Sequence, residues 1–189
     1  LAPLVPRDTA LVVGAGTIGL SCAAALRLAG VNRLLVVDID DAKLEVARRQ
    51  GADAVVNPRT GDLPRAVDEL TDGAGLDGTI DAVGLPATKE QSVALLAPGG
   101  TAVWIGLASD EVRFSGMPFV TGERSVLASY AYTHADFQRA LEFIVAGRVQ
   151  VDDWIRVVPL CEGVSAWWSI VRHEEKRPKV LLHPATGPV

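Results

Sequence analysis

The sequence predicts an α/β fold in which a doubly wound, parallel six-stranded sheet carries helices on both faces. The first observation behind this prediction is that short apolar runs alternate with stretches of helical periodicity, as in parallel sheets covered by helices. The second is that most of these runs are apolar throughout, which is typical of strands buried on both faces. The third is that glycines stand where the expected helices end.

Each expected element follows from this pattern. The strands are expected at residues 9–13, 34–37, 54–56, 78–83, 101–105 and 125–130. The helices are expected at residues 17–29, 41–50, 63–70, 88–96 and 134–145. After Gly147 the pattern changes, and we expect a helix at residues 161–172 between strands at 155–160 and 179–182.

The composition argues against several classes of protein. The 189 residues carry 18 Lys and Arg against 23 Asp and Glu, a net charge of −5, so we expect no nucleic-acid partner. Cys22 and Cys161 form no CxxC pair, which disfavours a disulfide scaffold or a cysteine-rich zinc module and suits a reducing cytoplasm. No apolar run reaches the roughly 18–20 residues that span a bilayer, so no membrane partner is expected.

A glycine-rich motif follows the first expected strand. The segment Gly14-Ala15-Gly16-Thr17-Ile18-Gly19 has the spacing G-x-G-x-x-G between a buried strand and a helix. In this pattern Gly14 permits a tight turn, Gly16 lets the backbone approach a pyrophosphate, and Gly19 lets the helix pack closely on the strand. Phosphates would then meet the first N–H groups of the helix, at Thr17 and Ile18, and the positive end of its dipole. The motif indicates a Rossmann-type dinucleotide site.

Asp38 closes the second expected strand, nineteen positions after Gly19. At this spacing the carboxylate accepts hydrogen bonds from the hydroxyls of the adenosine ribose. The alternative is that Asp38 only caps the helix that starts near Asp41. A carboxylate at the ribose would repel the 2′-phosphate of NADP, and no arginine follows Asp38 directly, since the next residues are Ile39 and Asp40. NAD is therefore the expected cofactor.

Further motifs extend along most of the chain. They are Leu11 to Gly19, Val36-Val37-Asp38-Ile39-Asp40, Leu44-Glu45-Val46-Ala47-Arg48, Gly51-Ala52-Asp53, Asp72-Gly73-Ala74-Gly75, Pro98-Gly99-Gly100 and Lys179-Val180-Leu181-Leu182. From about residue 9 to residue 184, these segments resemble the medium-chain dehydrogenase/reductase superfamily. Within it, the chain is most similar to the zinc-dependent alcohol and polyol dehydrogenases.

The resemblance implies cofactor contacts at six further residues, which are Lys43, Val83, Gly84, Ile105, Gly106 and Lys179. The first lysine would hydrogen-bond the adenosine ribose. Lys179 would approach the pyrophosphate, and the alternative is that Lys179 is a solvated lysine in a charged stretch. Val83 and Gly84 would lie on the adenine-ribose side of the cleft. Ile105 and Gly106 would lie near the nicotinamide ribose.

The resemblance also implies a function. The chain would be the cofactor-binding half of an NAD-dependent, zinc-type dehydrogenase that transfers a hydride from a secondary alcohol or polyol to NAD. Residues 1–132 would form the NAD-binding domain, and residues 133–189 would bridge to, and pack on, a GroES-like domain that holds the zinc.

That domain is expected to precede this chain, which begins at Leu1 rather than Met. The histidines His134, His173 and His183 and the two cysteines show no spacing typical of zinc ligands. We therefore assign no catalytic and no metal-binding residue in this chain, and expect the 189 residues alone to be inactive.

The strand expected from Ser125 to Tyr130 would form an edge of the sheet. Its unpaired backbone groups favour pairing with a symmetric copy, and enzymes of the superfamily commonly pair these strands across a two-fold axis. The expected partners are therefore a second copy of the chain and, in the full-length protein, a small alcohol or polyol.

Other functions that use a similar glycine-rich loop or cofactor fit the residues less well or stay open. A short-chain dehydrogenase would carry Tyr-x-x-x-Lys, but His134 follows four residues after Tyr130, and Asp136 four after Tyr132. A methyltransferase also uses a glycine-rich first loop, but the third glycine, Gly19, suits a dinucleotide better. Two alternatives stay open: a non-catalytic NAD-binding or dimerisation module, and a zinc-free, quinone-reductase-like member of the same superfamily.

Overall fold

The structure, a computed structural model, describes residues 9–172 and 174–184. Its largest part is a six-stranded sheet formed by β1 (Thr9–Val13), β2 (Arg33–Val37), β3 (Ala54–Val56), β4 (Leu76–Asp81), β5 (Leu96–Trp104) and β6 (Ser125–Ala128). The order across the sheet is β3-β2-β1-β4-β5-β6, and each neighbouring pair is parallel. This is the strand order of the Rossmann fold, and it confirms the expected doubly wound sheet.

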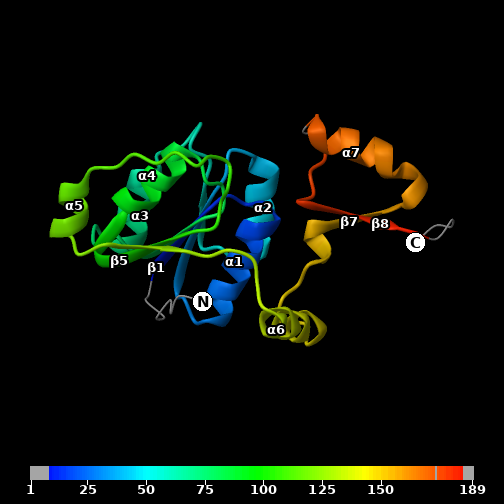
Figure 1. Cartoon of the computed structure of the whole chain (residues 1–189), viewed down its shortest axis with the longest axis horizontal. Helices are drawn as coiled ribbons and strands as arrows, with labels where there is room; N and C mark the ends of the chain where they lie inside the picture. The colour runs from blue at the N-terminus through cyan, green and yellow to red at the C-terminus, as the bar shows by residue number, and fades with distance from the viewer. Residues whose placement is uncertain (1–8, 173, 185–189) are drawn as a thin grey trace.

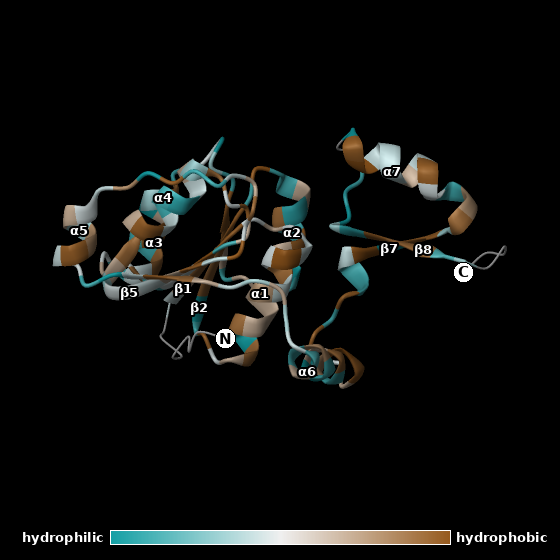
Figure 2. Cartoon of the chain, viewed as in Figure 1, coloured by the Kyte–Doolittle hydropathy of each residue, from teal (hydrophilic) through white to brown (hydrophobic). Residues whose placement is uncertain are grey.

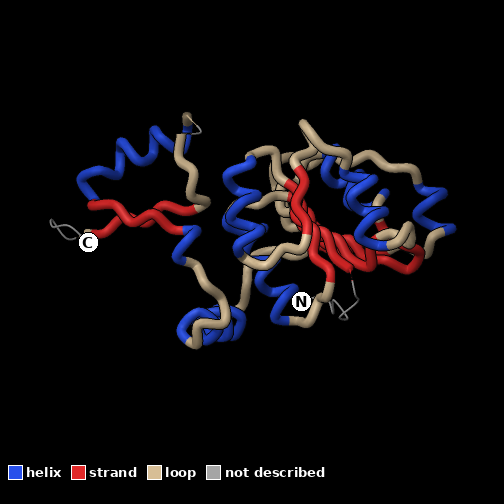
Figure 3. The backbone as a smooth tube through the Cα atoms, turned by 180° about the vertical axis from the view of Figure 1, so that it is seen from behind, coloured by secondary structure: helices blue, strands red, loops and turns tan. Residues whose placement is uncertain are grey.

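Helices cover both faces of this sheet (Figure 1). On one face lie α1 (Thr17–Leu28) and α2 (Asp41–Arg49), and on the other lie α3 (Leu63–Thr71) and α4 (Pro86–Ala94). The view from behind in Figure 3 shows the strands running between the two groups of helices. Local signals start two of the helices, because the carboxylates of Asp40 and Asp62 accept the free N–H groups of the first turns of α2 and α3.

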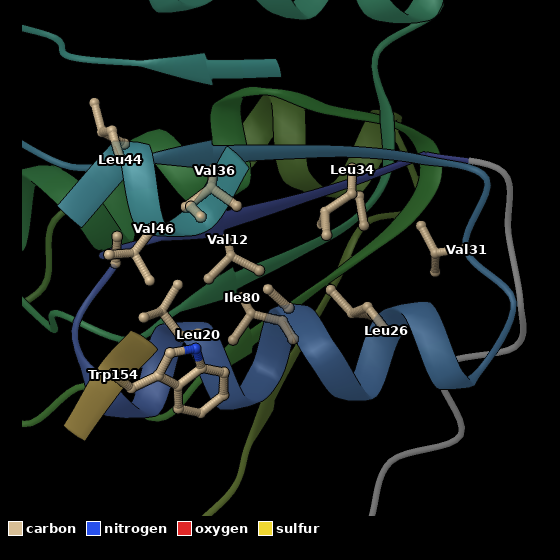
Figure 4. Close-up of a cluster of buried hydrophobic side chains, with 14 of the residues drawn as sticks. Val12, Leu20, Leu26, Val31, Leu34, Val36, Leu44, Val46, Ile80 and Trp154 are labelled. Carbon is tan, nitrogen blue, oxygen red and sulfur yellow. The ribbon is translucent and has the colours of Figure 1, made fainter. Parts of the chain in front are cut away.

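The strands send alternate side chains into the two layers, with the period of two that a sheet imposes. Val12 of β1 points into the layer of α1, where it belongs to one cluster with Leu20 and Ile80 (Figure 4). Its neighbours Leu11 and Val13 belong to the cluster that α3 covers. Both clusters are buried, and removal of their apolar surface from water is the main favourable contribution to folding.

The chain beyond the sheet forms α6 (His134–Val145), β7 (Ile155–Pro159), α7 (Gly163–Val171) and β8 (Lys179–His183). β7 and β8 form a separate parallel pair beside the large sheet (Figures 1 and 3). Trp154, in a 3₁₀ turn before β7, packs against the layer of α1 near Leu20 (Figure 4) and so attaches this region to the core. Figure 2 shows many apolar residues on α7 and β7, and Trp167 and Trp168 of α7 are 64% and 50% exposed.

Several expected boundaries are wrong by a few residues. The fourth strand, expected at residues 78–83, is β4 and ends at Asp81, because its side chain accepts backbone N–H groups and turns the chain there. The helix expected at 88–96 is α4, which starts two residues earlier because Pro86 occupies its first turn. The strand expected at 101–105 is β5, which begins at Leu96, where Leu96 pairs with Leu76 before a shift in register.

Elements nearer the C-terminus also differ from the boundaries expected from the sequence. The strand expected to end at Tyr130 is β6 and ends at Ala128. The helix expected at 161–172 is α7, preceded by a separate 3₁₀ turn, Leu160–Glu162. The helix α5 (Gly116–Thr121) was not expected, since six residues with a proline inside them show no helical periodicity. Within residues 9–172 and 174–184, no helix is both long enough and apolar enough to cross a membrane.

The close packing of α1 on β1 can be tested at Gly19. A Cβ at this position would lie 1.7 Å from the carbonyl oxygen of Gly14. Alanine usually favours a helix over glycine, but here we expect Gly19→Ala to lower the free energy of unfolding by about 3 kcal/mol, measured by chemical denaturation.

The matched control for this variant is Gly16→Ala. Gly16 has a φ of −74°, and a Cβ there would meet no atom within 4 Å. We expect this control to change the free energy of unfolding by less than about 1 kcal/mol. A Gly19→Ala protein as stable as the control would contradict the packing described here.

Candidate functional site

The carboxyl ends of the parallel strands meet at one edge of the sheet. The strand order reverses at β1, because the chain passes from β3 on one side of β1 to β4 on the other. The loops leaving β1 and β4 therefore diverge, and in open α/β sheets this crevice is where ligands bind. Most of the predicted cofactor residues lie on the segments that follow β1, β2, β4 and β5 at this edge.

The glycine-rich loop is held tightly at its start. The N–H of Gly14 donates to the carbonyl of Val37 at the end of β2, at 2.7 Å. Gly14 has a φ of +99°, and a Cβ there would lie 2.9 Å from Cγ2 of Val83. Glycine is required here both by the backbone conformation and by the close approach of the segment after β4.

The same loop is open at Gly16. This residue caps α1 without a side-chain hydrogen bond to the first turn, and a Cβ on Gly16 would meet nothing within 4 Å among the described residues. Thr17 and Ile18 form that first turn, and Ile18 is 53% exposed. The N-terminus of α1 thus presents polar N–H groups and a positive dipole end, which suit an anion such as a phosphate.

Asp38 lies next to this helix terminus. Its Oδ2 accepts the N–H of Ala15 at 2.7 Å, and its Oδ1 accepts the N–H of Asp40 at 2.9 Å. The alternative predicted for Asp38, a cap of the following helix, is wrong, because the cap of α2 is Asp40. A carboxylate has about four lone-pair sites, so the half-buried Asp38 keeps acceptor capacity beyond these two bonds.

Sequence reasoning missed the residue that organises the far side of the crevice, which is Asp81. The side chain is fully buried. Its Oδ1 accepts the N–H groups of Val83 and Gly84, both at 2.9 Å, and its Oδ2 accepts the hydroxyl of Thr88 at 3.1 Å. The available signal was an acidic residue at the end of an apolar strand, the same signal that singled out Asp38.

The backbone of Asp81 also holds the segment after β5. Its carbonyl accepts the N–H groups of Ile105 and Gly106, at 3.0 and 2.9 Å. Gly84 and Gly106 then face each other so closely that a Cβ on Gly84 would lie 2.2 Å from the carbonyl carbon of Gly106. One buried carboxylate and two glycines therefore bring together the two residue pairs that were predicted to line the cofactor cleft.

The two predicted lysines also come to this edge. The Thr17 hydroxyl donates to the Pro178 carbonyl at 2.8 Å, which brings the segment before β8 to the start of α1. Lys179 lines a cavity together with Thr17, and Lys43 of α2 lines another cavity together with Gly16. The structure thus places both lysines beside the glycine-rich loop, on different elements.

A zinc centre does not fit the donors that the structure describes. Within residues 9–172 and 174–184, no group of three or more His, Cys, Asp or Glu side chains could hold a metal ion, and structural and catalytic zinc sites need three or four protein ligands. Burial raises the pKa of the Cys22 thiol to about 11, so this thiol stays protonated at neutral pH. Cys161 is exposed in the turn before α7, His134 begins α6, and His173 lies outside the described residues.

Comparison with known proteins gives the family. Residues 17–146 match the family model of zinc-binding dehydrogenases. A D-xylulose reductase of Aspergillus oryzae is 33% identical over 158 residues, which cover 82% of this chain and 44% of that protein. An alcohol dehydrogenase of Cupriavidus necator is 41% identical over 115 residues, which cover 61% of this chain and 31% of that protein.

A solved structure agrees in fold. A protein described as a short chain alcohol dehydrogenase, from Escherichia coli CFT073 and complexed with NADH, is 26% identical, with a TM-score of 0.84 over 94% of this chain and 52% of that chain. The chain spans about half the length of several relatives that it matches. With the matched family model, the Rossmann strand order and the glycine-rich loop in place, the chain belongs to the zinc-binding dehydrogenase family of the medium-chain dehydrogenase/reductase superfamily.

Proposed function

We propose that this chain is the cofactor-binding half of an NAD-dependent, zinc-type alcohol or polyol dehydrogenase. The observation that carries the proposal is the uncapped N-terminus of α1, open at Gly16, beside the carboxylate of Asp38. The solved relative in complex with NADH supports it. When bound, the nicotinamide of NAD accepts a hydride from the substrate carbon.

The chain offers a binding group for each part of NAD. The pyrophosphate would accept hydrogen bonds from the N–H groups of the first turn of α1, with Lys179 adding a positive charge. Asp38 would accept both hydroxyls of the adenosine ribose, and Lys43 would donate to the same sugar. Ile39 is 53% exposed directly after Asp38 and offers an apolar surface to the adenine.

The cofactor would cross the end of β1, with one ribose on each side of the crevice. Val83 and Gly84 would line the adenine-ribose side of the crevice, and Ile105 and Gly106 the nicotinamide-ribose side. Because Asp81 holds both pairs through hydrogen bonds, the cleft is shaped before the cofactor arrives, which reduces the entropy lost on binding.

The cofactor preference can be tested at Asp38. A carboxylate at the ribose diol accepts two hydroxyls but repels a 2′-phosphate. We expect the chain to bind NAD more tightly than NADP, and Asp38→Ser to reduce the ratio of the two affinities by about tenfold or more. Isothermal titration calorimetry with each cofactor measures both affinities.

Asp41→Asn is the matched control, since it removes the same charge three residues away and keeps an oxygen that can accept from Asn57. We expect the control to leave the ratio unchanged. Equal affinity of the unmodified chain for NAD and NADP would contradict the role of Asp38.

The substrate and its activation would depend on groups outside the described residues. The names of the relatives point to alcohols and to the sugar D-xylulose, so we propose a small hydroxylated substrate. In zinc enzymes the metal lowers the pKa of a bound oxygen by several units, and the described donors cannot form such a site. We therefore expect the 189 residues alone to bind NAD without oxidising an alcohol.

The outer edge of the sheet, at β6, favours a homodimer. β6 is an outer strand of the large sheet, and Leu127 on it is 37% exposed. We expect a dimer by light scattering at tens of micromolar, on the order of a moderate interface affinity, and a monomer after Leu127→Lys. Val145→Lys, on the 79% exposed end of α6, should leave the mass unchanged. A monomeric wild-type chain would contradict this arrangement.

A further inference from the structure

Lys89 of α4 is buried in a way that is unusual for lysine. It is 7% exposed. Its Nζ donates to the carbonyl of Ser109 at 2.6 Å and lies 5.8 Å from the ring centroid of Trp104. Burial of an ammonium group costs free energy unless its partners compensate for the lost water. An apolar side chain would avoid this cost but could not donate to the Ser109 carbonyl. The hydrogen bond to Ser109 is therefore what distinguishes lysine from an apolar residue at this position.

Ser109 ends the segment that follows β5, residues 105–109. This segment runs along the chain that follows β4 and is attached to it at each end. At its start, the N–H groups of Ile105 and Gly106 donate to the Asp81 carbonyl. At its end, the N–H of Ser109 donates to the Gly84 carbonyl at 3.0 Å, and Lys89 binds the carbonyl of Ser109 from the other element.

The middle of the segment is exposed to solvent. Leu107 is 77% exposed, and the backbone bond that crosses next to it, from Ala108 to the Val83 carbonyl, is 3.3 Å long. The shorter backbone bonds lie at the two ends of the segment. After Ser109 the chain continues in exposed residues, of which Asp110 and Glu111 come first, and Lys89 is a buried side chain that binds the segment just before them.

We propose that Lys89 is a positioning residue for the nicotinamide ring of the cofactor, because it fixes the far end of the 105–109 segment on which that ring would lie. The ribose next to the ring would contact Ile105 and Gly106 at the other end of the segment, which Asp81 holds. This inference rests on the proposed function. Lys89 is buried behind the segment and acts through it, without contact to the cofactor. The adenosine and pyrophosphate contacts lie on the segments after β1 and β2 and at Val83 and Gly84. Asp81 holds the last two, so none of these contacts depends on Lys89.

Because only the contacts of the nicotinamide ring would depend on Lys89, two ligands that differ in this ring can test the proposal. ADP-ribose carries the adenosine, the pyrophosphate and the second ribose of NADH but lacks the nicotinamide ring. Lys89→Met keeps a long apolar side chain beside Trp104 and removes the donor to Ser109. We expect the variant to bind NADH about tenfold more weakly, as expected for loss of one hydrogen bond to a charged donor, and to bind ADP-ribose as tightly as the wild-type chain does.

Ser92→Ala is the matched control. The Ser92 hydroxyl accepts the indole N–H of Trp104 at 3.0 Å and donates to the Lys89 carbonyl at 2.7 Å, so it belongs to the same packing of α4 on β5. Its removal leaves the bond from Lys89 Nζ to Ser109 in place. We expect the ratio of NADH to ADP-ribose affinity to stay at the wild-type value in this control.

Hydrogen exchange gives a readout that does not need the cofactor. In Lys89→Met the amide of Ser109 should exchange faster than in the wild-type chain, and the amides of Val83 and Gly84 at the same rate.

Several results would overturn the proposal. The first is a ratio of NADH to ADP-ribose affinity in Lys89→Met that equals the wild-type ratio. The second is a fall of this ratio in Ser92→Ala as large as the fall in Lys89→Met. The third is an exchange rate of the Ser109 amide in Lys89→Met that equals the wild-type rate. A wild-type chain that binds ADP-ribose and NADH equally would overturn the role of the segment and leave the cofactor site standing. A chain that binds neither ligand would overturn the proposed function as well.

Discussion

The close contact between one helix and one strand determines where the free N–H groups at the start of α1 lie. Gly19 approaches the carbonyl of Gly14 at a distance that no side chain allows, so the first turn of α1 lies directly on the end of β1. A larger residue would move the helix away and carry its N–H groups out of the crevice. The bond from Gly14 to Val37 and the bond from Ala15 to Asp38 both start from the loop before this turn, and they connect the loop to the end of β2.

Two aspartates at strand ends shape the crevice, and their burial separates their roles. Asp38 accepts the N–H groups of Ala15, in the loop after β1, and of Asp40. Asp81 accepts two N–H groups of the loop that follows it. Asp81 is fully buried and also accepts a hydroxyl from Thr88, so its carboxylate is used within the protein. Asp38 is half-buried at the edge, with acceptor capacity left for a ligand. The same residue type thus serves the fold on one side of β1 and would serve the cofactor on the other.

The sequence predicts the elements that repeat a simple pattern. The ranges of β1, β3 and α6 agree with the expectation, because apolar runs or a regular helical period mark them and strong turn or cap residues bound them. The end of β4 depends on the local turn that the Asp81 carboxylate makes with the N–H groups after it, and an acidic residue closing an apolar strand was the available signal. The start of β5 depends on a register shift, which is a tertiary feature without a local signal. The same holds for the bond from Thr17 to Pro178, since 161 residues separate the two partners. Motif spacing could predict Gly14, Gly19 and Asp38, but not the network of Asp81 and Lys89 behind them.

The central claim is that NAD binds at the edge of the sheet where β1 ends. The most direct measurement is a titration of the isotope-labelled 189-residue chain with NAD, followed by amide chemical shifts. The account predicts saturable changes concentrated at residues 14–19, 38–39, 83–84 and 105–106, with little change in α3 or α6. Saturable changes confined to another surface, such as the cavity beside Arg27 and Arg148, or no saturable change at millimolar NAD, roughly the weakest affinity expected for a cofactor site, would contradict it.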